Sequence, residues 1–158
     1  MTIAGFLSPD AVVSAQRAGD KAQLLRELAQ RAGRALAIDP QVILGALQNR
    51  EALGSTGVGQ GIALPHAKIA GLQRLFGLFA RLQRPVEFDA IDGRPVDLVF
   101  LLLVPDRPGN EGLTALASVA RQLRDGDVVD QLRAAATESA LYQALVAPLP
   151  SDVAPGSS

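Results

Sequence analysis

The stretch Val96-Asp97-Leu98-Val99-Phe100-Leu101-Leu102-Leu103-Val104 contains the longest apolar run of the sequence, residues 98–104. A membrane helix needs roughly 18 consecutive apolar residues, so this run is too short to span a bilayer. Its branched side chains suit a buried strand. We therefore predict a buried strand here and no membrane insertion of the chain.

Two further strands are predicted upstream of this stretch. Residues 75–82 are apolar and include two phenylalanines, and residues 86–88 are short and extended. Between them and the buried strand, Asp92-Gly93 predicts a tight turn, because glycine accepts the positive φ that such turns need. Residues 105–109 contain two prolines and a glycine and predict a loop after the buried strand.

Helical patterns flank this block of strands. Asp20 can cap a helix whose apolar residues reach Ala32, with Gly33 or a nearby residue available to end it. A second helix is predicted from Asp39-Pro40, where aspartate can cap and proline fits the first turn, to about Leu53-Gly54. Three more helices are predicted: one from Leu113 that is stopped by Gly126, one capped by Asp127 that runs through Leu132, and one from about Thr137 to Ala147.

Helices on either side of a block of strands predict an α/β fold, a single-domain sandwich in which α-helices flank a mixed β-sheet. The sheet is expected to be mixed because one connection is a tight hairpin and the others contain helices. A chain of 158 residues, 48% of them hydrophobic, can bury one substantial core. The domain is expected over residues 1–148. Residues 149–158 are rich in proline, glycine, alanine and serine and predict a flexible C-terminal tail.

Charge and cysteine content narrow the functional classes. Lys plus Arg total 15 and Asp plus Glu total 16, so there is no overall basic field to attract nucleic acid or an anionic membrane. The absence of cysteine excludes disulfides and thiolate metal sites and is compatible with a reducing compartment. Residues 1–7 lack the basic region of a signal peptide, so a cytoplasmic location is expected.

The segment 50–68 joins the second helix to a short apolar strand, residues 62–64, and is rich in glycine. Its glycines let the backbone turn sharply and present N–H groups to an anion, and the hydroxyls of Ser55 and Thr56 add donors. It is not a Walker loop, because no Lys-Ser/Thr follows the glycines, and not a dinucleotide motif, because the third glycine is missing. The segment is a candidate phosphate cradle, with a plain glycine-rich hairpin as the alternative.

His66 is the only histidine and follows Pro65 at the end of the short apolar strand. A neutral imidazole can attack a phosphoryl group through either ring nitrogen, and the alternative is a structural histidine. No metal site is expected, because carboxylates would have to complete one. Arg50, at the end of the second helix, can reach a phosphate on His66 or serve only as a helix-end cation. Three carboxylates are expected to be solvated surface residues without a chemical role: Glu51, Asp89 and Asp92.

The sequence closely resembles the phosphorylation-site signature of mannitol/fructose-type and nitrogen-related enzyme IIA domains of the bacterial phosphotransferase system. The resemblance lies in Arg50-Glu51 and in the run Gly54-Ser55-Thr56-Gly57-Val58-Gly59-Gln60-Gly61-Ile62-Ala63-Leu64-Pro65-His66-Ala67-Lys68. Residues 85–98, 132–135 and 141–143 extend it over nearly the whole chain.

The resemblance implies a phosphoryl carrier that needs no cofactor. Phosphate would arrive on His66, at the ε2 nitrogen, from a phosphorylated HPr-like carrier protein. Arg50 would stabilise the charge of the phosphate, and Ser55, Thr56 and Gly57 become candidates for phosphate binding. Regulatory target proteins, whose identity the sequence does not give, are the other expected partners.

One position departs from the family pattern. Many relatives place a second histidine where this sequence has Gly112. That histidine can orient or hydrogen-bond the phosphorylated one, whereas glycine offers only a backbone donor. The departure predicts either slower transfer or a protein that acts mainly through its unphosphorylated form.

The sequence favours the nitrogen-related branch, in which the phosphorylation state of His66 regulates partner proteins, because no IIB or membrane IIC region follows the domain. One alternative is a sugar-specific (fructose/mannitol-type) enzyme IIA that passes phosphate to a IIB domain. Another is a regulator that docks on its targets without useful phosphotransfer. A general α/β binding protein for small anions is the last, and it leaves the full-length resemblance unexplained.

Overall fold

Strand β6 (Val96–Pro105) is the predicted buried strand, and in the computed structural model, which describes residues 1–149, it lies inside a mixed sheet. It pairs antiparallel with β5 (Phe76–Val86) on one side. On the other side it pairs parallel with β3 (Ile62–Ala63) and then with β4 (His66–Ile69). Every residue from 98 to 103 is at most 1% exposed, so both faces of β6 are covered.

Two short strands form the edges of the sheet. β1 (Val12–Gln16) pairs parallel with β5, and β2 (Gly57–Gly59) pairs antiparallel with β3. The order is β1-β5-β6-β3-β2, and β4 also pairs with β6. The combination of parallel and antiparallel pairs confirms the predicted mixed sheet.

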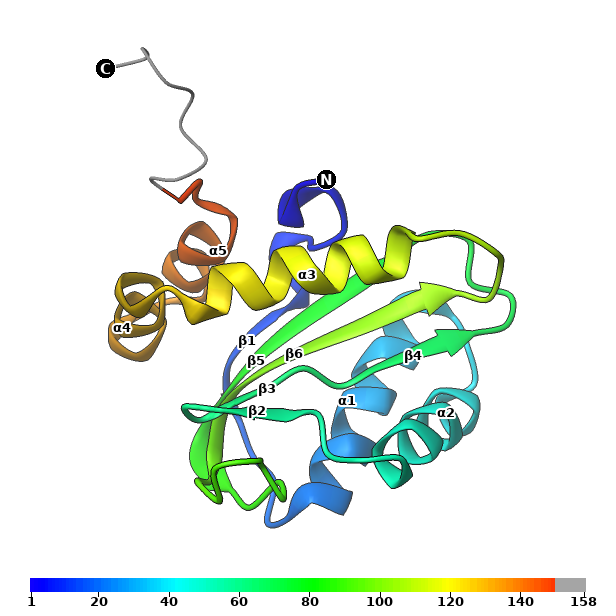
Figure 1. Cartoon of the computed structure of the whole chain (residues 1–158), viewed down its shortest axis with the longest axis horizontal. Helices are drawn as coiled ribbons and strands as arrows, with labels where there is room; N and C mark the ends of the chain where they lie inside the picture. Colours follow the sequence, from blue (N-terminus) through cyan, green and yellow to red (C-terminus); the bar gives the residue numbers. More distant parts are fainter. Residues whose placement is uncertain (150–158) are drawn as a thin grey trace.

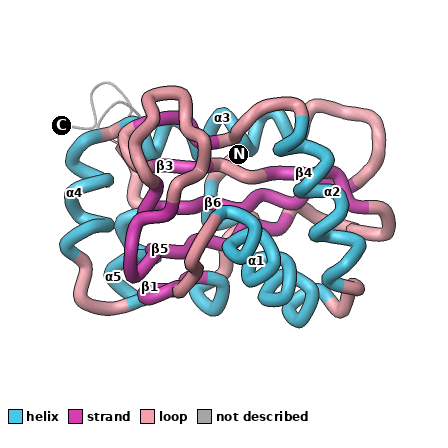
Figure 2. Tube along the Cα trace, turned by 90° about the horizontal axis from the view of Figure 1, so that it is seen from below, coloured by secondary structure: helices cyan, strands magenta, loops and turns pink. Residues whose placement is uncertain are grey.

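The helices form layers on both faces of this sheet. Their bounds are α1 (Lys21–Leu36), α2 (Pro40–Ala52), α3 (Glu111–Arg124), α4 (Gly126–Ala134) and α5 (Glu138–Val146), with two short 3-10 helices, η1 (Ile3–Gly5) and η2 (Pro9–Ala11). Helices α1 and α2 cover one face and α3 covers the other (Figures 1 and 2), while α5 packs against β1. None of the helices within residues 1–149 is long and apolar enough to cross a membrane.

Capping side chains start three helices where the sequence predicts. The Asp20 carboxylate accepts from the Gln23 N–H at 2.8 Å and the Asp39 carboxylate from the Gln41 N–H at 2.9 Å. Pro40 occupies the first turn of α2, and the Thr137 hydroxyl caps α5. Each cap satisfies a backbone donor that the first helical turn leaves unpaired.

Three predicted boundaries differ from the structure in whole or in part. Of the two possibilities given for the end of α1, Gly33 is wrong and a nearby residue is right, because the helix continues to Leu36 and ends at Ala37 with a left-handed φ of 55°. Asp127 does not cap α4, because Asp125 does so by accepting from the Val128 N–H at 3.1 Å.

The third concerns residues 75–82 and 86–88, predicted as two strands. The structure has one strand, β5, which ends at Val86 and pairs with β6 on both sides of a register shift between Arg81 and Val86. The exposed polar residues inside that shift interrupt the apolar pattern without ending the strand.

The Asp92-Gly93 turn is confirmed, with Gly93 at φ 72°, inside the longer connection 87–95. The exposed Asp92 carboxylate accepts the N–H of Gln60 at 2.9 Å and the N–H of Arg94 at 3.1 Å. These hydrogen bonds, with the nearby Arg94 charge, hold the pKa of Asp92 below its usual value. Asp92 therefore ties this connection to the tip of the β2–β3 hairpin.

The predicted tail, residues 149–158, lies outside the described residues except for Leu149. The Leu149 side chain is only 6% exposed and belongs to the hydrophobic core.

Gly33 is packed too closely to accept a side chain. A Cβ there would lie 2.7 Å from the Ile38 carbonyl oxygen and 2.9 Å from Pro40 Cγ, at the turn between α1 and α2. We predict that Gly33→Ala destabilises the protein. Overpacking lowers the free energy of unfolding by about 1–3 kcal/mol, whereas the higher helix propensity of alanine raises it by only about 1 kcal/mol. Urea unfolding measures the net change.

Gly45→Ala is the matched control. Gly45 lies inside α2 with no atom within 4 Å of the added Cβ, so the same substitution should stabilise the protein by roughly 0.5–1 kcal/mol. If both variants gain stability, the close packing at Gly33 is not limiting.

Candidate functional site

The sheet places His66 at the start of β4. This strand runs parallel to β6 with His66 opposite Leu102, and the Leu102 N–H donates to the Pro65 carbonyl at 2.9 Å. Pro65 itself has no N–H to donate, and it separates β3 from β4. His66 therefore opens a strand rather than ending the predicted strand 62–64.

Both nitrogens of the His66 ring have a partner. Nδ1 lies 2.8 Å from the Leu64 carbonyl oxygen, and Arg50 Nε lies 3.3 Å from Nε2. A carbonyl oxygen only accepts and a guanidinium only donates, so Nδ1 carries the proton and Nε2 presents its lone pair to Arg50. This arrangement selects the neutral imidazole with an unprotonated ε2 nitrogen.

Arg50 lies in the last turn of α2 and is half-buried. Besides its contact with His66, its Nη1 donates to the Gly54 carbonyl at 2.9 Å. The predicted proximity of Arg50 to His66 is confirmed, and the guanidinium is held by a second contact rather than extended into solvent. Its remaining N–H groups are free to meet an anion at Nε2.

Glu51 corrects the sequence-based expectation of a solvated carboxylate. Its side chain is only 6% exposed and pairs with Lys21 Nζ at 3.0 Å. Oε1 accepts the Thr56 N–H at 3.0 Å, and Oε2 accepts the Thr56 hydroxyl. Lys21 also lies over the Phe88 ring, 4.5 Å from its centroid. Buried charges persist only when paired in this way, so Glu51 anchors the loop that follows Arg50.

The three residues expected to bind phosphate have partners inside the protein. The Ser55 hydroxyl donates to the Phe88 carbonyl at 2.6 Å and accepts the Gly57 N–H at 3.0 Å. The Thr56 hydroxyl and N–H both donate to Glu51. These bonds shape the loop next to His66, and direct phosphate binding by Ser55, Thr56 and Gly57 stays a prediction.

The glycines of this segment build a hairpin, which was the alternative to a phosphate cradle. Gly59 and Gly61 turn the chain from β2 into β3 at φ 95° and 79°, with Gln60 between them at φ 60°. Arg133 from α4 fastens this tip, because its Nη2 donates to the Gln60 carbonyl at 2.7 Å while its fork pairs with Asp97. Hydrogen bonding to Asp97 raises the pKa of Arg133 above its usual value.

A cavity of about 520 Å³ lies beside His66 and Arg50. Lys68 lines it from the same face of β4 as His66, two residues further along the strand, and Asn49 lines it from α2. Lys68 belongs to the segment that resembles the phosphorylation-site signature, and its two-residue spacing from His66 on a strand is the signal that indicates a shared face. At the rim, Leu53 is 85% and Leu113 71% exposed, so apolar side chains surround the imidazole.

Gly112 lines the same cavity from the first turn of α3. A Cβ at this position would lie 2.7 Å from Val104 Cγ1, so α3 approaches β6 more closely than a side chain permits. The position at which the resemblance implies a second histidine in many relatives therefore lines the cavity beside His66. Here the lack of a side chain lets α3 pack closely against β6.

The Lys21–Glu51 pair allows a stability test. Glu51→Gln should destabilise the protein by about 1–3 kcal/mol, because a partly buried ammonium loses its counter-charge and a hydrogen-bond acceptor. Adding Lys21→Met should cost less than the sum of the two single changes, since it removes the unpaired charge. Urea unfolding of both single variants and the double variant measures the coupling. Strictly additive losses would show that the two charges do not stabilise one another.

Comparisons with known proteins identify similar sequences and a similar fold. Residues 5–147 match the family model for the phosphoenolpyruvate-dependent sugar phosphotransferase system, EIIA 2. The nitrogen regulatory protein of Bradyrhizobium diazoefficiens is 45% identical over 148 residues, which cover 94% of this chain and 97% of that protein. The nitrogen regulatory protein of Pseudomonas aeruginosa is 46% identical over 129 residues, covering 81% and 84%.

A solved structure extends the similarity to three dimensions. The crystal structure of nitrogen regulatory protein IIA-Ntr from Neisseria meningitidis superposes with a TM-score of 0.86 at 34% identity, over 90% of this chain and 98% of that one. Because the family model covers most of the sequence and the relatives match over nearly their full lengths, this chain belongs to the EIIA 2 family of the phosphoenolpyruvate-dependent sugar phosphotransferase system.

Proposed function

We propose that this protein is a phosphoryl carrier and regulator of the nitrogen-related phosphotransferase system, which accepts phosphate on His66 from a phosphorylated HPr-like protein. The observation that carries the proposal is the pair of contacts on the His66 ring. The Leu64 carbonyl fixes the proton on Nδ1, and Arg50 lies 3.3 Å from Nε2. A nucleophile and its charge-stabilising partner are thereby already in place.

The transfer step follows from these contacts. The Nε2 lone pair attacks the phosphorus atom, and a new N–P bond forms as the bond to the donor breaks. Arg50 then moves its N–H groups from Nε2 to the phosphoryl oxygens, where charge collects. The half-buried ring and its apolar rim let a docked carrier exclude water from the transferred group.

The nitrogen-related branch is favoured because nitrogen regulatory proteins match over 94% and 81% of the chain at 45% and 46% identity, whereas a fructose-specific EIIA component of Haloferax volcanii matches over 78% of the chain at 37% identity. In this branch, the phosphorylation state of His66 decides which regulatory targets the protein binds. The sugar-specific alternative differs in one observable, the onward transfer of phosphate to a IIB domain.

A second candidate function is a regulator that docks on targets without useful phosphotransfer. The observation that favours it is Gly112, which leaves Arg50 without the help of a second imidazole in the same cavity. Incubation with phosphoenolpyruvate, enzyme I and an HPr-like protein separates the two functions, because a docking regulator takes up no phosphate.

His66→Ala should abolish phosphorylation while the protein stays folded. Incubation with phosphoenolpyruvate, enzyme I and an HPr-like protein should add one phosphate to the wild-type chain, seen by intact-mass measurement, and none to the variant. The label should survive base and be lost in acid, as expected for a phosphoramidate. Acid-labile phosphate on the His66→Ala variant would disprove the assignment.

Arg50→Ala should slow phosphorylation about a hundredfold or more, because it removes a preorganised donor aimed at phosphoryl charge. Arg50→Lys should recover only part of the rate, since an ammonium lacks the planar fork. Stopped-flow transfer from the phosphorylated carrier measures both rates. Wild-type rates in both variants would show that Arg50 does not stabilise the phosphoryl charge and is only a cation at the C-terminal end of α2.

A further inference from the structure

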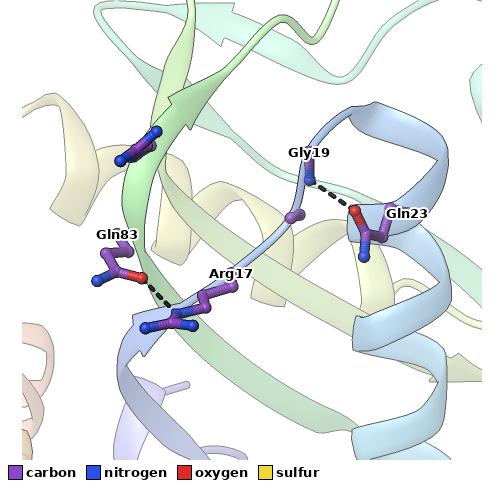
Figure 3. A pocket seen from close by; sticks show the side chains of 6 residues that line it. Arg17, Gly19, Gln23 and Gln83 are labelled. Atoms are coloured by element: carbon purple, nitrogen blue, oxygen red, sulfur yellow. Dashed lines mark hydrogen bonds between the residues drawn. The ribbon is translucent and has the colours of Figure 1, made fainter.

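A second pocket, of about 420 Å³, lies between the end of β1, the start of α1 and the part of β5 where the register against β6 shifts. None of its lining residues lines the cavity at His66. They are Arg17, Ala18, Gly19, Gln23, Gln83 and Arg84 (Figure 3). Ala18 packs against the hydrophobic core, and the proposed phosphotransfer uses none of these six residues.

The side-chain oxygens in this pocket are already occupied. Arg17 Nε donates to Gln83 Oε1 at 2.6 Å, and the Gly19 N–H donates to Gln23 Oε1 at 2.7 Å, as the dashed lines of Figure 3 mark. Because an arginine Nε and a backbone N–H can only donate, each glutamine must turn its oxygen toward them. Each glutamine is left with a free amide NH₂, which is a donor.

The guanidinium groups add more donors. Both terminal nitrogens of Arg17 are unbonded. The guanidinium of Arg84 has no hydrogen bond or ion pair with any residue in the part of the chain that the structure describes. No carboxylate lines the pocket, and the neighbouring Asp20 accepts the Gln23 N–H in the cap of α1. The lining side chains thus offer two positive charges, unbonded N–H donors and no negative charge.

We propose that this pocket binds a small, soluble phosphate-bearing anion. A surface with two positive charges and no carboxylate repels a cation and attracts an anion. Phosphate oxygens accept several hydrogen bonds at once and match the planar fork of arginine. The volume suits a small molecule rather than a protein segment, and the pocket accepts it without displacing an internal hydrogen bond.

Pyrophosphate is the probe for this site. Titrated into ¹⁵N-labelled full-length protein at constant ionic strength, it should give saturable amide shifts at residues 17–23 and 83–84. Arg84→Gln should weaken this binding roughly tenfold, because it removes one charge-assisted pair and breaks no internal contact. Arg26→Gln, which removes an exposed arginine of α1 outside the pocket, should leave the affinity unchanged.

The proposal is overturned if the shifts do not saturate, if sodium chloride produces them equally, or if Arg84→Gln and Arg26→Gln weaken binding alike. Acetate tests the ligand class, because it offers one carboxylate in place of phosphate oxygens. Acetate should bind more weakly than pyrophosphate, and equal affinity would reject a phosphate site. Shifts confined to the surroundings of His66 would place the anion in the other cavity and also reject it.

Discussion

The burial of β6 is the constraint on which the rest of this structure depends. Residues 98–103 have no exposed face, so the strand needs partners on both edges and cover on both sides. The long β5 satisfies one edge, and the two short strands β3 and β4 share the other. Because β4 has to pair with β6 in a fixed register, His66 is held opposite Leu102 by the same hydrogen bonds that complete the core.

The charges at the end of α2 are arranged so that they do not cancel. Arg50 and Glu51 are neighbours in sequence, yet Arg50 contacts His66 whereas Glu51 contacts Thr56 and Lys21. Lys21 balances the buried carboxylate, so the guanidinium keeps its charge available at the imidazole. One helix end therefore both anchors the loop and supplies the cation, and the two roles depend on α1 lying against α2.

Much of the fold is predictable from sequence because its strongest signals are local. The apolar run of β6, the caps at Asp20 and Asp39 and the turn at Gly93 are each encoded within a few residues. The N-terminal strand β1 went unpredicted, because it is only five residues long and its sequence, Val-Val-Ser-Ala-Gln, does not alternate regularly between apolar and polar residues. Strand β4 is four residues long and includes Lys68, so it has no apolar signature of its own and forms by pairing with β6.

The candidate site is likewise predictable where its signals are local and unpredictable where they depend on tertiary contacts. His66 and Arg50 stand out as residue types in a recognisable segment, and the structure brings them together. Glu51 was expected to be solvated because its partner, Lys21, lies far away in sequence and is brought near only by the packing of α1 on α2. Gly33 was named as one residue that could end α1 because glycine often ends helices, but the structure uses it where the turn between α1 and α2 leaves no room for a side chain. Local patterns identify chemistry, whereas burial and pairing depend on tertiary contacts.

Gly112 links the chemistry of the site to this packing. The absence of a side chain lets the first turn of α3 settle against Val104 of β6, at a distance that leaves no room for a Cβ. A histidine at this position requires either a smaller residue at 104 or an α3 that lies further from the sheet. Gly112 and Val104 together therefore leave no room for a second imidazole. Arg50 is left as the residue whose donor contacts the ε2 nitrogen. In the proposed phosphotransfer, the stabilisation of phosphoryl charge would therefore depend on the end of α2 rather than on α3.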